Sequence, residues 1–151
     1  YYSNRASDII KLKPGFYGLS NQLLDCDWPK VNKGRDNLSK LIDDEMPDNE
    51  LFNASFNLLF DTGDDEAFSN SFIATAEYGT CAATVLTLSA SGKINFQEQG
   101  FKHNGQQEDL LSYSLQAQPK IHPYKVRIAS VVSNVQSFLI RLFSSAHQHI
   151  L

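Results

Sequence analysis

The sequence predicts an α+β fold in which antiparallel sheets are layered with helices. Apolar residues recur at helical spacing after residue 30 and again after residue 47. Farther along, Cys81–Ala90 and Lys93–Phe101 are rich in strand-forming residues and flank a Ser-Gly turn. These strands and helices come in separate runs, which favours antiparallel pairing over alternating βαβ units.

Composition limits the classes of protein to consider. The chain has 151 residues and a formal net charge of −4, which is typical of one soluble domain and gives no basis for nucleic-acid binding. Two cysteines are too few for a disulfide scaffold, and no run of 18 apolar residues predicts a membrane span. Because Tyr1–Arg5 resembles the interior of a strand, we expect the chain to be part of a longer protein.

The first thirty residues predict two strand pieces and a long loop. Tyr1–Arg5 and Ile9–Leu12 resemble strands around a polar turn. The stretch Gly15–Lys30 begins with a Pro-Gly turn, and Gly18 within it permits a close backbone approach. This stretch is either a structural loop that buries Trp28 or a loop that forms a site.

Two helices and an acidic loop follow. Val31–Asp44 has Leu38, Leu41 and Ile42 at helical spacing. A second helix is predicted from Pro47 onward, with Asp48 as its N-cap. Its broad apolar face comprises Leu51, Phe52, Ala54, Ser55, Phe56, Leu58 and Leu59. Residues 61–66 are rich in acids, but their spacing differs from the twelve-residue calcium loop, so a solvated loop is the simpler interpretation.

Three strands and a short helix complete the first 118 residues. We expect strands over Ser71–Thr75, Cys81–Ala90 and Lys93–Phe101, the last two forming a hairpin. In Gln106–Gln116, the leucines at 110, 111 and 115 are interpreted as one face of a short helix.

Residues 119–151 form a second, basic segment without acidic residues. Apolar residues here recur at three- and four-residue steps and predict an amphipathic basic helix over 124–143. The helix would dock on the domain, on a partner or on an anionic membrane surface. The residues that carry the pattern are Ile128, Val131, Val132, Val135, Phe138, Leu139, Leu142 and Phe143.

No motif in the sequence carries a chemistry by itself. Cys26 lies between two aspartates that disfavour a thiolate, and Cys81 follows Gly-Thr at a strand start, so both are interpreted as structural. His147 and His149 are two residues apart, which does not place them on one helical face, and no intrinsic metal or cofactor is expected.

Several short motifs, in the same order along the chain, resemble the transport and Golgi organisation protein 2 family, also called the NRDE family. They cover about residues 1–101. The matching residues are Tyr2 to Arg5, Leu12, Pro14-Gly15, Tyr17 to Asn21, Leu24-Asp25, Trp28 to Val31, Lys33-Gly34, Thr62-Gly63, Glu66, Phe72-Ile73, Tyr78 to Thr80, Thr84 to Leu86, Gly92, Phe96, Glu98 and Phe101.

The resemblance implies a fold similar to that of the N-terminal-nucleophile hydrolases, with two layered antiparallel sheets flanked by helices. It implies a non-enzymatic role in haem trafficking or in lipid and acyl-CoA homeostasis, with haem as a cargo, in the cytoplasm and in association with mitochondria or the Golgi. The alternative is an amidohydrolase whose nucleophile lies in an N-terminal part that precedes Tyr1. Cys81 and Gln99 stand where the family commonly has arginine, which weakens any anion-binding role of that hairpin.

For the carrier role, we expect a mostly apolar pocket between sheet and helices, closed partly by Gly15–Lys30. The candidate pocket residues are Tyr17, Asn21, Trp28 and Lys30. Trp28 would supply an apolar wall, and Lys30 a positive charge for a propionate or phosphate group.

Overall fold

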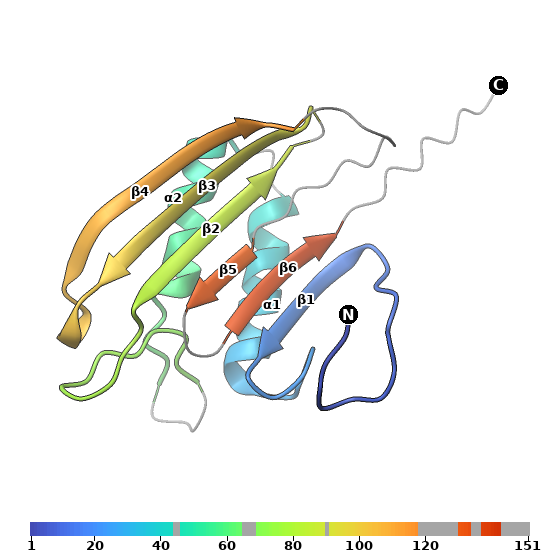
Figure 1. Cartoon of the computed structure of the whole chain (residues 1–151), viewed down its shortest axis with the longest axis horizontal. Helices are drawn as coiled ribbons and strands as arrows, with labels where there is room; N and C mark the ends of the chain where they lie inside the picture. The colour runs from blue at the N-terminus through green and yellow to red at the C-terminus, as the bar shows by residue number, and fades with distance from the viewer. Residues whose placement is uncertain (44–45, 65–68, 90, 118–129, 134–136, 143–151) are drawn as a thin grey trace.

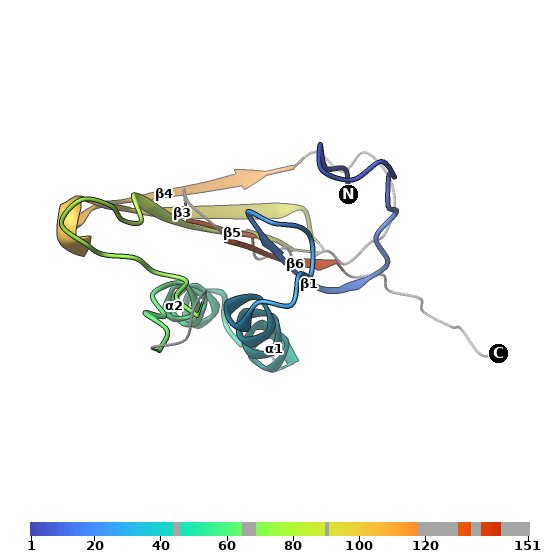
Figure 2. The same ribbon diagram turned by 90° about the horizontal axis from the view of Figure 1, so that it is seen from below.

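In the described part of the chain, the fold is one six-stranded antiparallel sheet with two helices on one of its faces (Figures 1 and 2). The computed structural model describes residues 1–43, 46–64, 69–89, 91–117, 130–133 and 137–142. The predicted α+β class is confirmed. The second sheet implied by the resemblance is not among the described residues, so the likeness to N-terminal-nucleophile hydrolases stays a prediction.

The sheet has the strand order β1-β6-β5-β2-β3-β4, and every neighbouring pair is antiparallel. The strands, in chain order, are β1 (Gly15–Ser20), β2 (Ala82–Leu88), β3 (Lys93–Phe101), β4 (Gln107–Gln116), β5 (Ser130–Ser133) and β6 (Ser137–Leu142). β1 and β4 therefore lie at the two ends of the described sheet.

The two helices predicted after residue 30 and after residue 47 are present. Helix α1 spans Pro29–Asp43 and begins where the carbonyl of Trp28 accepts the amides of Val31 and Asn32. Pro29 is the first helical residue, where proline's missing N–H costs nothing. Helix α2 spans Asp48–Leu59, and its N-cap is Pro47 rather than the predicted Asp48.

The hydrophobic core lies between the two helices and β2. Its buried residues are Leu38, Ile42, Leu51, Phe52, Phe56, Leu59, Ala83, Val85 and Phe101. Phe60, Phe72 and Phe101 pack edge to face against one another beside it. Since these side chains fill the space between helices and sheet here, the predicted pocket cannot lie in this part of the interface.

The predicted hairpin of β2 and β3 is confirmed, and its strands pair with Leu88 opposite Ile94 and Ala82 opposite Gly100. Gly92 closes the turn at φ +82°, a backbone conformation that favours glycine.

The predicted helix over Gln106–Gln116 is wrong, because Gln107–Gln116 forms β4. Asn104 (φ +61°) and Gly105 (φ +73°) turn the chain so that it returns along β3. Asn-Gly is a strong hairpin signal. The edge of β3 forms backbone hydrogen bonds with the returning chain, and a local helical pattern does not reveal this pairing.

The predicted helix over 124–143 is also wrong in the described residues, where β5 and β6 lie between β2 and β1. A strand inside a sheet is often continuously apolar, and such a run mimics helical spacing. The β-branched Val131 and Val132 favour the strand. The rest of the predicted helix, and His147 and His149, lie outside the described residues.

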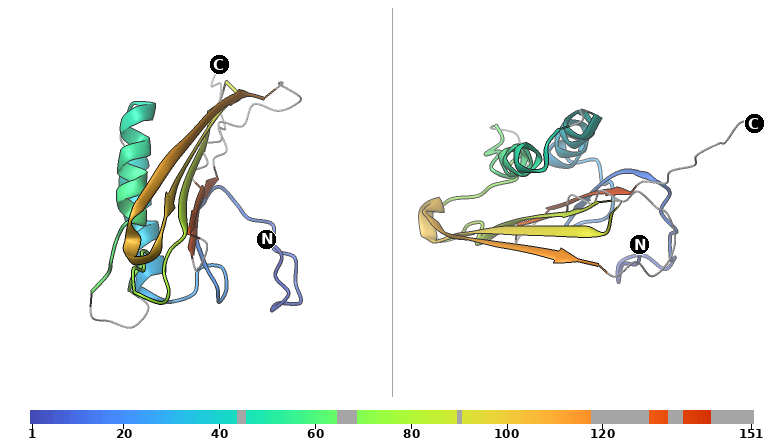
Figure 3. Two further views of the ribbon diagram at one scale, coloured as in Figure 1. Left: turned by 60° about the vertical axis from the view of Figure 1, so that its left-hand side comes forward. Right: turned by 90° about the horizontal axis from the view of Figure 1, so that it is seen from above.

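Four further assignments differ from the structure. Tyr1–Arg5 and Ile9–Leu12 are irregular coil, and Ser71–Thr75 forms only an isolated bridge from Ala74 to Gly79. Conversely, Gly15–Ser20 is a strand and not part of a loop. The N-terminal coil lies beside β1, toward the side of the sheet away from the helices (Figure 3).

The sheet face away from the helices carries apolar side chains on β2, β3 and β4, with the hydrogen-bonded pair Thr84 and Glu98 on the same face. Ala83 and Val85 point into the core, so the alternate residues of β2 point the other way. The residues of β3 and β4 that pair across the sheet with these outward residues of β2 lie on the same face. We call this set the outer apolar face: Leu86, Leu88, Ile94, Phe96, Leu111, Tyr113 and Leu115.

Candidate binding site beside the first strand

The segment between β1 and α1 folds back along the outer edge of β1. Leu24 forms an antiparallel bridge with Leu19, and the amide of Asp25 donates to the carbonyl of Gly18 at 2.6 Å. Gly18 itself lies against α1: a Cβ at this position would be 2.6 Å from Cγ1 of Val31 and 3.3 Å from the Val31 carbonyl oxygen. The glycine thus allows strand and helix to approach closely, as its position in the sequence predicted.

Asp25 fixes this segment to both β1 and α1. Its Oδ1 accepts the Gly18 amide at 2.7 Å and lies 3.5 Å from the guanidinium of Arg35. Arg35 also donates to Asn32, whose amide donates to Asp27 at 2.7 Å. Asp25 has φ +50°, a left-handed conformation that aspartate tolerates better than most residues.

Ser20 and Cys26 meet inside this segment. The hydroxyl of Ser20 is 2.9 Å from the Cys26 sulfur, and it also accepts the amide of Gln22. Ser20 is buried and Cys26 is half-buried, as a free thiol. The carboxylates of Asp25 and Asp27, on either side of the cysteine, are each engaged by other partners.

Trp28 and Lys30 form the second half of the site. The ammonium of Lys30 is 5.4 Å from the centroid of the Trp28 ring, a cation–π geometry. Only 4% of the surface of Lys30 is exposed, while Trp28 is half-buried. Desolvation lowers the pKa of Lys30 from its ordinary 10.5, and Cys26 nearby partly offsets this. The site thus combines a half-buried aromatic ring with a cation that is shielded from water.

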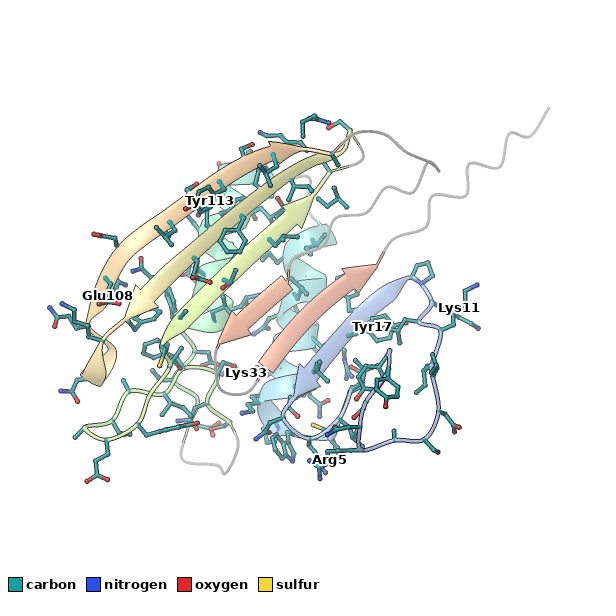
Figure 4. All side chains as sticks on the ribbon, in the orientation of Figure 1. Arg5, Lys11, Tyr17, Lys33, Glu108 and Tyr113 are labelled. Atoms are coloured by element: carbon teal, nitrogen blue, oxygen red, sulfur yellow. The ribbon has the colours of Figure 1, made fainter. Side chains whose placement is uncertain are left out.

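The four candidate pocket residues are not all brought together. Trp28 and Lys30 are in contact. Asn21 is exposed at the start of the segment, where its carbonyl accepts a hydrogen bond from Arg5 at 3.3 Å. Tyr17 points away from the helices, since its neighbour Phe16 packs on the core, and its hydroxyl donates to the Lys13 carbonyl (Figure 4).

Sequence reasoning missed three residues that build the site. Asp25 and Arg35 hold the segment in place, and Ser20 contacts the cysteine. Cys26 and Ser20 are six residues apart in the sequence, and no motif indicates that they are in contact. A possible signal was the pattern Gly18 to Asp25, since a glycine on a strand and a turn-forming acid soon after it suit a chain that doubles back.

Comparison with known protein families identifies the family of the chain. The family model described as Transport and Golgi organisation 2 matches residues 1–103, which include β1, both helices, β2 and β3. No curated protein and no solved structure matches the chain. In the described part of the chain, no helix is long and apolar enough to cross a bilayer. As the match covers more than half of its length, the chain belongs to the Transport and Golgi organisation 2 family.

Proposed function

We propose that the chain acts, without catalysing a reaction, as a carrier in haem or acyl-lipid trafficking and homeostasis. Its place of action is the cytoplasm, in association with the Golgi or mitochondria. Membership of the Transport and Golgi organisation 2 family supports the trafficking role at the level of the family description. The choice of haem or acyl-CoA as the cargo is more specific than the family description and is our own proposal.

The observation that carries the proposal is the pairing of Trp28 with Lys30. An ammonium in a poorly solvated place attracts a carboxylate or phosphate more strongly than one in water. An aromatic ring next to it provides apolar contact. Haem propionates and the phosphates of acyl-CoA are anions attached to large apolar bodies, so both match a cation beside an aromatic face.

We do not place the proposed ligand at the interface between α2 and β2. The core fills that space, whereas Trp28 is half-buried at the start of α1. We therefore place the ligand's anionic end against the segment from residue 21 to 30. Tyr17 lies on the face of β1 away from α1, so we propose that it fixes the preceding coil through the Lys13 carbonyl and does not contact the ligand.

The test uses the single tryptophan of the chain as its own probe. Palmitoyl-CoA is titrated while Trp28 emission is recorded, and haem is titrated by its Soret absorption. Lys30→Met is compared with Lys40→Met, which removes an exposed lysine from the same helix. We expect Lys30→Met to weaken binding about tenfold, the loss of one charge-assisted contact.

Two results would contradict the proposal. Wild-type chain that binds neither probe would rule out both cargoes, and equal affinity of the two lysine variants would rule out the Trp28–Lys30 site. Binding of only one probe decides between haem and acyl-CoA.

A further inference from the structure

Strand β4 is a bare edge in the described sheet. It pairs with β3 on one side only, from Lys93 opposite Gln116 to Phe101 opposite Gln107. All ten of its residues are exposed, and Tyr113 and Leu115 expose 56% and 62% of their surfaces. Its outward amides and carbonyls are thus placed to accept another strand.

From Leu110 to Gln116, this edge lacks the usual protection against pairing, since the irregularity in its register with β3 lies earlier, between Gln107 and Leu110. Natural edge strands carry charges, prolines or bulges that prevent another strand from docking. From Leu110 to Gln116 there is no charged residue and no proline. The only acids, Glu108 and Asp109, lie at the beginning of the strand.

The sequence of β4 is a palindrome about Tyr113. It reads Leu-Ser-Tyr-Ser-Leu from Leu111 to Leu115. A two-fold axis through Tyr113 would set two antiparallel copies so that leucine meets leucine, serine meets serine and tyrosine meets tyrosine. An interface between identical copies needs this kind of self-complementarity.

The same axis keeps the acids apart and joins the apolar surfaces. In this register, Glu108 and Asp109 lie beyond the paired residues, so like charges do not face each other. Tyr113 already contacts Phe96, with ring centroids 6.1 Å apart, on the outer apolar face. Two such faces would become one continuous surface across the joined sheets.

We propose that a second copy of this chain docks along β4, antiparallel and with its two-fold axis at Tyr113. The assembly closes at two copies, because each chain has one β4. The other end of the sheet does not extend it, since residues 24 and 25 occupy the outer edge of β1.

Sedimentation velocity of the 151-residue chain over a concentration series tests the proposal. We expect a reversible dimer in the wild type. Tyr113→Lys or Tyr113→Glu alone places like charges opposite each other at the axis and should raise the dimer Kd at least about tenfold. An equimolar mixture of the two variants should recover the dimer. Tyr78→Lys, at an exposed loop position, is the control and should dimerise like the wild type.

Cross-linking gives a second test that does not depend on affinity. In a Cys26→Ser, Cys81→Ser background, Tyr113→Cys should form a disulfide between copies, since facing residues of antiparallel strands have Cα atoms about 4.5–5.5 Å apart. Asp109→Cys should not, because its two copies would lie about 26 Å apart along the ladder. A wild type that stays monomeric, a dimer unaffected by both Tyr113 charge variants, or cross-linking at 109 rather than 113 would overturn the proposal.

Discussion

The two terminal strands of the sheet, β1 and β4, differ in whether their outer edges are covered. At β1, the chain folds back and occupies the edge with the bridge from Leu19 to Leu24 and the contacts of Asp25 with Gly18. At β4, every residue is exposed and no charge interrupts the strand after Asp109. The same sheet thus has one edge that is built into a polar site and one that is open to a partner.

The comparison shows where substitutions should matter. At the β1 end, strand, segment and helix share contacts, so one change disturbs several elements. At the β4 end, the side-chain contacts among the described residues are with β3 and the turn before it, so the free energy of unfolding should depend weakly on them.

The largest effect is expected from Gly18→Val. A Cβ here would lie 2.6 Å from the Val31 side chain, and the strand cannot move away without losing its contact with α1. Overpacking of this kind should lower the free energy of unfolding by about 3 kcal/mol, measured by urea denaturation. Gly15→Ala is the matched control, as its Cβ would make ordinary contacts of 3.6 Å with Tyr17. Equal stability of the two variants would show that the close approach at Gly18 is not required.

Asp25→Ala should cost about 2 kcal/mol in urea unfolding, because it leaves the Gly18 amide and Arg35 without this carboxylate. Asp25→Asn retains an oxygen acceptor and tolerates the positive φ, so it should recover part of the loss. Asp27→Ala, which removes one exposed contact to Asn32, should cost less. If Asp27→Ala cost as much as Asp25→Ala, the edge would not depend on Asp25.

Lys30→Met should stabilise the chain at pH 7 by about 1 kcal/mol, since it removes a buried charge. Burial lowers the pKa of Lys30 in the folded state, so the cost of burying the charge is full at neutral pH. As pH rises through the folded pKa toward 10.5, the unfolded state binds more protons and the wild type gains stability. The advantage of Lys30→Met in urea unfolding should therefore shrink at pH 10. An advantage that does not change with pH would contradict the role of desolvation.

The smallest effect is expected from Leu115→Ser on β4. Because 62% of this residue is exposed, the free energy of unfolding should change by no more than about 0.5 kcal/mol in dilute, monomeric protein. A loss as large as that of Gly18→Val would show that the β4 end is packed against something that its exposure does not reveal.

The sequence predicted the local features of the fold and missed those set by distant pairing. Helices α1 and α2 and the β2–β3 hairpin have clear periodicity and turn residues, so they were predicted close to their bounds. β4, β5 and β6 were predicted as helices, because leucine and valine spacings fit both periods in short runs. Only the neighbouring strand decides between them, and a sequence does not show which strand that is.

The candidate site was predicted only in part, because some of its contacts are local in sequence and others depend on how the chain folds back. Trp28 and Lys30 are close in sequence, and the structure brings them into contact. Asp25 and Arg35 are linked by the way the segment wraps onto α1, and Ser20 meets Cys26 only because the chain doubles back along β1. Tyr17 lies apart from Trp28 and Lys30, because its stretch was interpreted as a loop, whereas the alternation of a strand turns Tyr17 away from Phe16 and the core.

Amide hydrogen exchange, resolved by residue at two protein concentrations, tests the contrast between the edges most directly. The amide of Gly18, bonded to Asp25, should be protected at both concentrations, because its partner is in the same chain. The outward amides of β4 should exchange fast in dilute protein and become protected in concentrated protein, as copies pair along this strand. A Gly18 amide that exchanges as fast as the outward amides of β4, or β4 amides already protected in dilute protein, would contradict the account of one closed and one open edge.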